Sequence, residues 1–264
     1  MNPAPSPLTE TLLNKVPQIT LAFWVIKIMA TTVGETAADF LILNVGLGLV
    51  VTSLIMSALL VGIIAFQLKL REYVPTSYWL VVVFVSIVGT LVSDYMVDDL
   101  GISLVTTTIG FALALTVTFL AWYASERTLS IHSIFTRRRE LFYWAAILFT
   151  FALGTSAGDL IAEHFGLGYA VSAVIFGALI AVVYAAYRFG VDAVLTFWVA
   201  YILTRPFGAS MGDLLSQPTN NGGLGLGTTG TSVLFLVTIA GLVSYLSITK
   251  KDKIETNAIA TLSA

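Results

Sequence analysis

Long apolar stretches separated by short polar connections dominate the chain, which is 264 residues long. Each stretch approaches the roughly 20 residues that a helix needs to cross the hydrocarbon core of a membrane. The pattern therefore predicts an all-α integral membrane protein with eight transmembrane helices. We expect these helices at residues 18–42, 47–68, 77–97, 102–124, 141–162, 167–187, 192–215 and 229–248.

The connections between these stretches are too short to hold a separate soluble domain. We therefore expect a single transmembrane domain at 18–248, with cytoplasmic tails at 1–17 and 249–264. The first ten residues contain three prolines and an acid where a secretory signal would have a basic flank and an apolar run. The N-terminal tail is thus expected to be disordered and to remain in the mature protein.

A pattern of tryptophan, glycine and aspartate recurs four times with the same offsets. The four copies are Trp24/Gly34/Asp39, Trp79/Gly89/Asp94, Trp144/Gly154/Asp159 and Trp198/Gly208/Asp213. After each aspartate come two small residues and a hydroxyl residue. These are Gly46/Gly48/Thr52, Gly101/Ser103/Thr107, Gly166/Gly168/Ser172 and, after a three-residue insertion, Gly223/Gly225/Thr229.

The recurrence predicts four repeats of two helices each, at about 18–70, 75–125, 140–188 and 192–248. Because two is an even number, every repeat enters the membrane in the same direction, so the repeats are parallel. We expect a pseudo-fourfold or twice-twofold bundle. The repeat glycines should allow its helices to pack closely.

The four Trp/Gly/Asp copies resemble a family of bacterial integral membrane proteins built of tandem repeats of unknown function. In that family each repeat has two transmembrane segments and a characteristic tryptophan. The resemblance extends from Trp24 to about Leu246. It implies a multi-pass protein of the bacterial inner (plasma) membrane, and it implies no particular activity.

Charge is sparse and unevenly placed. Hydrophobic residues make up 57% of the chain and charged residues 11%, and the net charge is −2. A chain with so little charge of either sign is not expected to bind nucleic acid. The basic residues lie in the termini and in alternate loops, whereas the opposite loops carry acids such as Asp98 and Glu163. The positive-inside rule then predicts that both termini are cytoplasmic.

The repeat tryptophans are predicted to form an aromatic belt at the cytoplasmic membrane interface. The repeat aspartates, Asp39, Asp94, Asp159 and Asp213, allow two interpretations. They could accept hydrogen bonds from the start of a following helix. Alternatively, parallel repeats could bring the four together, with Thr52, Thr107, Ser172 and Thr229 nearby, as an all-oxygen site for a metal ion or protons.

Three further charged residues, Lys27, Glu35 and Arg205, lie well inside predicted membrane helices. An ionisable residue there costs about 3 kcal/mol or more unless it is paired or hydrated. One interpretation is a buried salt bridge between Glu35 and either basic residue, which would join the first and last repeats. The other is a substrate or coupling site near the bilayer midplane, where transporters place such sites.

These residues predict a transporter of a small cation, with a divalent metal similar to Mn²⁺ as one candidate and proton coupling through carboxylates. The alternatives are a transporter of a small anion that uses Arg205 and Lys27, or a non-transporting assembly or sensing subunit. We expect no enzyme and no cofactor, since the chain lacks a nucleophile–base arrangement and a cofactor motif. The expected partners are the lipid bilayer and a small ion or molecule. Both a monomer and a homo-oligomer are compatible with the sequence.

Overall fold

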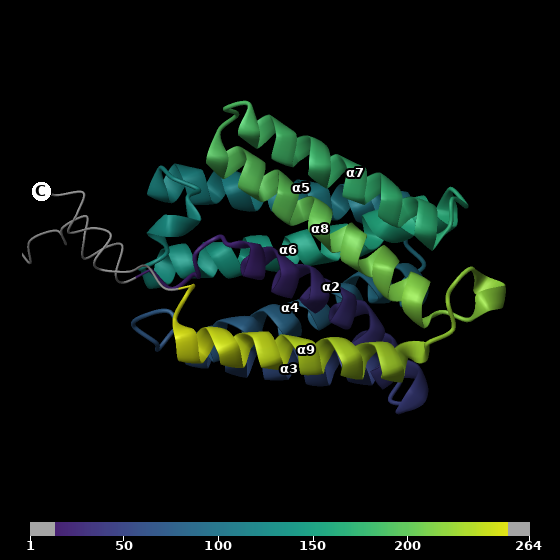
Figure 1. Ribbon diagram of the computed structural model, residues 1–264. Coiled ribbons are helices and arrows are strands. Elements are labelled where there is room, and N and C mark those ends of the chain that lie inside the picture. Colours follow the sequence, from purple (N-terminus) through teal and green to yellow (C-terminus); the bar gives the residue numbers. More distant parts are fainter. Residues whose placement is uncertain (1–13, 253–264) are drawn as a thin grey trace, which may run out of the picture.

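A computed structural model describes residues 14–252, which contain eight α-helices and no β-strand. The helices are α2 (Leu21–Asp39), α3 (Leu49–Gln67), α4 (Pro75–Asp94), α5 (Leu104–Glu126), α6 (Arg137–Asp159), α7 (Tyr169–Arg188), α8 (Ala193–Ser216) and α9 (Gly227–Thr249). All eight run along one common axis (Figure 1). The prediction of an all-α protein with two helices in each of four repeats is therefore confirmed.

The helices begin where the sequence offers a partner for the free N–H groups of a first turn. The side chains of Thr20, Ser103 and Asp192 accept hydrogen bonds from backbone N–H groups three residues later. Gly48 and Gly168 precede α3 and α7 with φ values of 73° and 75°, which favour glycine. The second small residue of the first three repeats thus marks the turn into the second helix.

The first helix of each repeat lies in an inner ring, in which α2 and α6 each pack against both α4 and α8. The second helix lies outside this ring and packs against the first helix of the following repeat. These pairs are α3 with α4, α5 with α6, α7 with α8, and α9 with α2. Because the same contacts recur at every step, the repeats close into a pseudo-fourfold bundle.

Contacts of the repeat glycines show the same cyclic order. A Cβ atom added to any of these glycines would overlap a residue of the next inner helix. The pairs are Gly34 with Ser86, Gly89 with Phe151, Gly154 with Arg205, and Gly208 with Thr31. The four partners occupy one equivalent position, seven residues after each repeat tryptophan. Close packing at the repeat glycines, which the sequence predicts, is thus confirmed.

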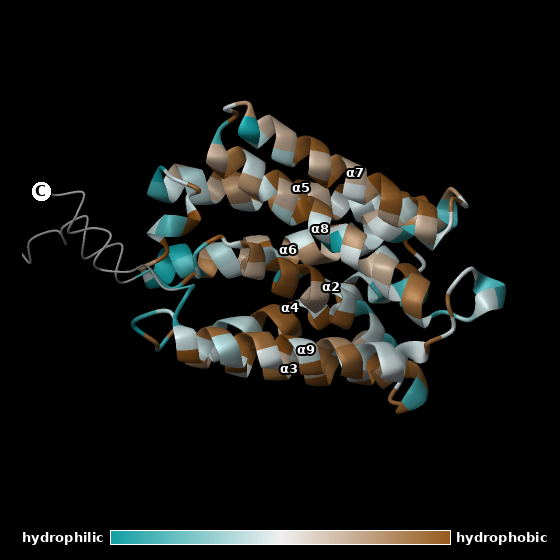
Figure 2. Cartoon of the chain, viewed as in Figure 1, coloured by the Kyte–Doolittle hydropathy of each residue, from teal (hydrophilic) through white to brown (hydrophobic). Residues whose placement is uncertain are grey.

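Six of the described helices, α3, α4, α5, α6, α7 and α9, are long and apolar enough to cross a membrane. The other two, α2 and α8, carry Lys27, Glu35 and Arg205 and belong to the inner ring. Apolar residues cover much of the outer helices, while polar residues concentrate at the ends of the bundle (Figure 2). The fold is that of a helical membrane protein whose outer helices surround a more polar interior.

Most of the two predicted tails, residues 1–13 and 253–264, lies outside the described residues. The remaining part of the N-terminal tail, residues 14–17, is buried rather than free in solution. Asp252 is buried as well, and its carbonyl oxygen accepts a hydrogen bond of 3.0 Å from the backbone N–H of Gln18. The packed part of the protein therefore extends beyond the predicted limits of 18–248.

The tryptophans do not form the predicted belt at the membrane interface. Trp79, Trp122, Trp144 and Trp198 are at most 4% exposed, and Trp24 is half-buried. The repeat tryptophans pack with other rings at the N-terminal ends of the inner helices. We call this set the aromatic layer: Phe23, Trp24, Tyr78, Trp79, Tyr143, Trp144, Phe197 and Trp198. The belt prediction was wrong because most of these rings are buried in the helix bundle and pack against one another.

Candidate functional site

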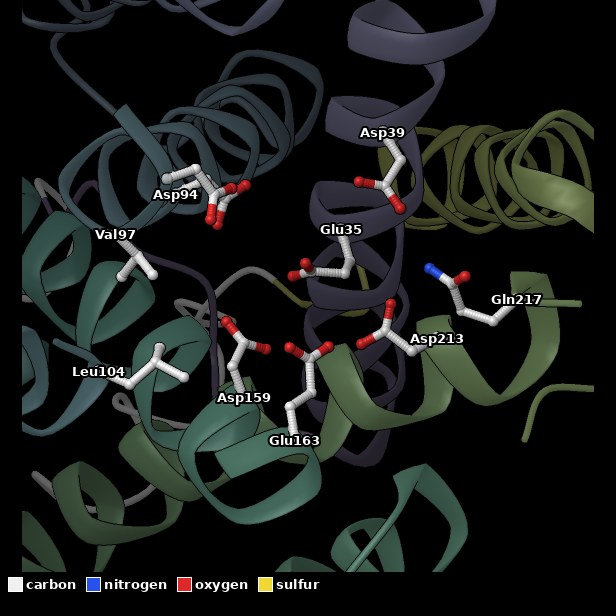
Figure 3. Close-up of a pocket in the computed structure, with 10 residues that line it drawn as sticks. Glu35, Asp39, Asp94, Val97, Leu104, Asp159, Glu163, Asp213 and Gln217 are labelled. Atoms are coloured by element: carbon white, nitrogen blue, oxygen red, sulfur yellow. The ribbon is translucent and has the colours of Figure 1, made fainter. Parts of the chain in front are cut away.

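A cavity of about 170 Å³ lies at the C-terminal ends of the inner helices, opposite the aromatic layer. It is lined by Glu35, Asp39, Asp94, Val97, Asp98, Leu104, Asp159, Glu163, Asp213 and Gln217. In Figure 3 the carboxyl groups of the labelled acids point toward one shared space. These acids are Glu35, Asp39, Asp94, Asp159, Glu163 and Asp213. Seven of these ten described residues are acidic and none is basic. We call this site the acidic cavity.

The repeat geometry explains why the aspartates meet. Asp39, Asp94 and Asp159 are the last residues of α2, α4 and α6, and Asp213 lies in the last turn of α8. In a closed ring of parallel repeats, equivalent positions face the same axis at the same height. Glu35 stands one turn before Asp39 and so shares its face of α2. The sequence-predicted acids are thus brought together from all four repeats.

The side chains of the four aspartates make no hydrogen bond or ion pair with another described residue. Asp39, Asp94 and Asp159 each precede a short π-helical turn, yet their side chains do not cap it. Asp213 is the most enclosed, with 7% of its surface exposed. Buried polar groups are usually hydrogen-bonded, so four open carboxylates around one space leave room for a ligand. The helix-capping interpretation does not match this geometry.

Three inner helices continue past the aspartate as a single π-helical turn: Phe40–Asn44, Tyr95–Asp99 and Leu160–His164. π-Helical turns are rare in proteins as a whole, and those that occur are often found at functional sites. The fourth inner helix differs, because α8 remains α-helical to Ser216. The aspartates of repeats one to three therefore sit at a helix junction, and Asp213 sits within a regular helix.

Arg205 joins the four inner helices below the acidic cavity. It is fully buried on α8, and its guanidinium donates to Glu35 Oε2 at 3.1 Å and to the carbonyl oxygen of Thr31 at 3.4 Å, both on α2. The same group donates to Thr90 on α4 and, at 2.7 Å, to Thr155 Oγ1 on α6. Of the two salt bridges that the sequence allows, the structure forms Arg205–Glu35. This pair closes the inner end of the cavity, since Glu35 also lines it.

Lys27 lies on the other side of Arg205, and it is also fully buried. Its ammonium donates to the carbonyl oxygen of Tyr201 at 2.8 Å and to the hydroxyl of Thr204. The rings of Tyr201 and Phe151 lie 4.3 Å and 5.4 Å from it. No carboxylate among the described residues is within ion-pair distance of Lys27, so Lys27 takes no part in the salt bridge to Glu35 and does not border the acidic cavity.

The four hydroxyl residues predicted to accompany the aspartates do not line the acidic cavity. Thr52, Thr107 and Ser172 are buried at the start of the outer helices, where Thr52 Oγ1 donates to the carbonyl oxygen of Gly48 at 2.7 Å. They lie away from the axis because the second helix of each repeat stands outside the inner ring.

Thr229 was also assigned to the wrong position of its repeat. It is exposed, whereas Thr231 is buried and donates to the carbonyl oxygen of Gly227 at 2.9 Å, as Thr52 does to that of Gly48. Gly225 and Gly227 have positive φ values, as do the small glycines of the first and third repeats. The insertion in the fourth repeat therefore has five residues rather than three: Asp39 and Thr52 differ by 13 positions, and Asp213 and Thr231 by 18.

The carboxylates of the acidic cavity lie too far apart for three of them to bind one metal ion directly. Among the described residues, no three His, Cys, Asp or Glu side chains are close enough to hold one ion together. Divalent ions such as Mg²⁺ often keep several waters and use only one or two carboxylates. An ion in the acidic cavity would therefore have to keep some of its waters.

Three polar residues of the cavity, Asp98, Glu163 and Gln217, are absent from the predicted site. Each lies four residues after a repeat aspartate, on the same face of the helix. The corresponding position in the first repeat is Leu43. Extending the polar stripe forward by one turn would have found them. The prediction followed the stripe only backward, into the membrane.

The opposite end of the ring is closed by a buried polar network. Lys15 Nζ pairs with Glu140 Oε2 at 2.6 Å, and Gln67 Nε2 donates to Glu140 Oε1 at 3.4 Å. Tyr73 donates to Asp252 at 2.5 Å. Burial, reinforced by this carboxylate, raises the pKa of Tyr73, so the phenol stays protonated and keeps donating. Both ends of the described chain are thereby fixed over the aromatic layer.

Fold and site together define a helical membrane protein of four parallel two-helix repeats around an acidic cavity. The model of the family described as Repeat of Unknown Function (DUF347) matches residues 22–73, 77–128, 142–190 and 196–252. The chain belongs to this family. No curated protein and no solved structure matches it.

Proposed function

We propose that the protein transports a small cation across the membrane and that the acidic cavity is where the ion enters or leaves. The observation that carries this proposal is the lining of the cavity, with seven acids and no base among its ten residues. Such a lining concentrates cations and repels anions, and a low-dielectric wall strengthens this field. Ionisable residues within membrane helices commonly mark ion pathways.

The same lining weighs against transport of an anion. Arg205 and Lys27, the residues that would bind it, lie behind the acids rather than in the lining. Arg205 is already engaged by Glu35 and by three threonines, and Lys27 by Tyr201 and Thr204. An anion would have to pass seven acidic residues to reach either base. A monovalent or divalent cation, such as Mn²⁺, meets no such electrostatic barrier at the entrance of the cavity.

The spacing of the carboxylates supports a partly hydrated ion and exchange with protons. Ionised acids gathered around one small space repel one another unless a cation or protons balance them. A transported cation and protons would therefore compete for Asp39, Asp94, Asp159 and Asp213. This competition is the basis of the proton coupling that we propose.

The distribution of basic residues supports an orientation in the bacterial inner membrane. Lys15, Lys69, Arg137, Arg188 and Lys250 lie at the ends of the helices remote from the acidic cavity. By the positive-inside rule this end faces the cytoplasm. The acidic cavity then opens on the outer side of the membrane, and the end sealed by Lys15 and Glu140 is the cytoplasmic end.

A flux assay in proteoliposomes tests the proposal. We expect the wild-type protein to move Mn²⁺ down an imposed gradient faster than protein-free liposomes do. The double change Asp159→Asn and Asp213→Asn should lower this rate at least about tenfold, as expected when about 1.4 kcal/mol of ion binding is lost. Asp99→Asn is the matched control, since Asp99 is an exposed acid beside Asp98 that does not line the cavity.

Absence of Mn²⁺, K⁺ and proton flux through folded wild-type protein would contradict transport. That result would favour the non-transporting alternative, in which the polar stripe only holds the helices together. Equal loss of flux in the Asp99→Asn control would mean that general surface charge, rather than the acidic cavity, governs the rate.

A further inference from the structure

Lys27 is a fully buried base that the proposed transport cycle does not yet use. It lies two turns before Glu35 on α2, and the Arg205–Glu35 pair separates it from the acidic cavity. Its repeat equivalents on the other inner helices are Val82, Ile147 and Tyr201, and all of these are fully buried. These side chains fill this level of the ring, so no hydrated ion fits beside Lys27 in this conformation, whereas a proton can bind to its amine.

The surroundings of Lys27 leave its positive charge without a balancing acid. From α8 it faces Tyr201, Thr204 and the like-charged Arg205, and from α6 it faces Phe151. The nearest acid on its own helix, Glu35, is paired with Arg205. The equivalent level of α4 contributes the uncharged Val82. Among the described residues, two aromatic faces, the carbonyl oxygen of Tyr201 and the hydroxyl of Thr204 favour the ammonium form.

Lysine and arginine behave differently in such a place. A guanidinium stays charged in proteins, whereas a buried lysine can give up its proton. Arg205 is therefore a fixed charge at the inner end of the acidic cavity, and Lys27 is an exchangeable one.

We propose that Lys27 is a proton-binding site whose proton is released to solvent when a cation enters the acidic cavity. The step converts an ammonium into an amine and frees one proton, so no bond other than N–H is broken. The inference rests on the proposed cation transport. It assigns the coupling to a buried amine, in addition to the carboxylates of the cavity.

Electrostatics makes this coupling large enough to measure. Eight residues of helix separate Glu35 from Lys27, a rise of about 12 Å. At an effective dielectric constant of about 20, one unit charge at that distance changes proton binding roughly tenfold. A divalent ion doubles the free-energy effect and so changes it about a hundredfold. Loss of the proton from Lys27 and binding of Mn²⁺ should therefore favour each other.

Calorimetry of Mn²⁺ binding to the full chain in detergent tests the assignment, with the titration repeated in buffers of different ionisation enthalpy. The difference between buffers gives the number of protons released for each ion bound. We expect Lys27→Met and Lys27→Gln to release fewer protons than the wild type, by up to one. Lys27→Arg should also release fewer and should bind Mn²⁺ more weakly than the two neutral variants, because its charge cannot be removed.

Lys69→Met is the matched control, because Lys69 is exposed and remote from the cavity. It should release as many protons as the wild type. If folded Lys27→Gln releases the wild-type number of protons and Lys27→Arg binds Mn²⁺ as tightly as Lys27→Gln does, the assignment is wrong and the carboxylates alone carry the coupling. If the folded wild type binds no Mn²⁺, cation transport itself is contradicted, and this inference fails with it.

Discussion

The two ends of the inner ring are built from the same four helices and have opposite characters. At the C-terminal ends, four repeat aspartates face a shared space, and no side chain among them makes a hydrogen bond or ion pair with a described residue. At the N-terminal ends, aromatic rings fill the axis, and the buried charge of Lys15 is paired with that of Glu140. One end is hollow with uncompensated charge, and the other is packed with compensated charge.

This difference separates residues that stabilise the fold from residues that are free to bind a ligand. Buried charges that are paired and hydrogen-bonded satisfy one another. Acids held apart from any partner do not, and such a placement is expected where a site acts on something outside the chain. Arg205 marks the boundary, since it is paired with Glu35 and also borders the hollow half. Four substitutions test this division.

Arg205→Met should have the largest effect on stability, because Arg205 contacts the other three inner helices between the two ends of the ring. It removes donors to α2, α4 and α6 and leaves Glu35 buried without a partner. We expect the free energy of unfolding to fall by about 3–5 kcal/mol, measured by denaturant unfolding in detergent. Adding Glu35→Gln should restore part of the loss. Arg188→Met, at an exposed site on α7, serves as the control and should change little.

Lys15→Met tests whether charge at the closed end is structural. Removing this base leaves Glu140 buried with Gln67 as its remaining polar partner, so we expect a loss of about 3 kcal/mol. Asp213→Asn removes a charge at the hollow end and should leave stability unchanged or raise it, because like charges repel. Thermal unfolding of both variants measures the contrast. A loss of equal size in both would remove the distinction between the two ends.

Among the three substitutions expected to destabilise the protein, Gly208→Ala should cause the smallest loss. The added methyl group would overlap the Thr31 side chain and lie 3.1 Å from the carbonyl oxygen of Ile28, where α8 meets α2. Overpacking of this kind costs about 1–3 kcal/mol. Gly62→Ala, on the outer helix α3 with open space around it, should show no loss. If both changes are neutral, close glycine contacts do not hold the two ends in one ring.

Much of the fold could be predicted because the same sequence pattern occurs in four repeats. The Trp/Gly/Asp offsets fix the number of repeats, and two helices per repeat fix their parallel arrangement. The order in which the helices pack could not be predicted, since the sequence does not say whether α3 contacts α2 or α4. The direction of the tryptophans was missed for the same reason. A tryptophan that faces lipid and a tryptophan that packs against a neighbouring helix cannot be told apart from the sequence alone.

The acids of the candidate site could be predicted in part. Their equivalent positions in parallel repeats were enough to predict that Asp39, Asp94, Asp159 and Asp213 lie at the same end of the bundle. It could not separate Thr229 from Thr231, because glycines fill the loop before α9 and allow several alignments of the insertion. It also could not choose between Arg205 and Lys27 as the partner of Glu35. That choice depends on the staggering of α8 against α2, which only the packed structure shows.

The packing of each second helix on the following repeat has a consequence for how such a protein can originate. A single two-helix unit leaves both of its helices without their proper neighbours, so it cannot fold alone. Four separate copies could exchange their second helices around a circle and reach the same bundle. Such a homotetramer would make the same cyclic contacts that the four repeats make within this chain. Since Gln18 and Asp252 meet at the point where the circle closes, a circularly permuted chain opened between two repeats should still assemble.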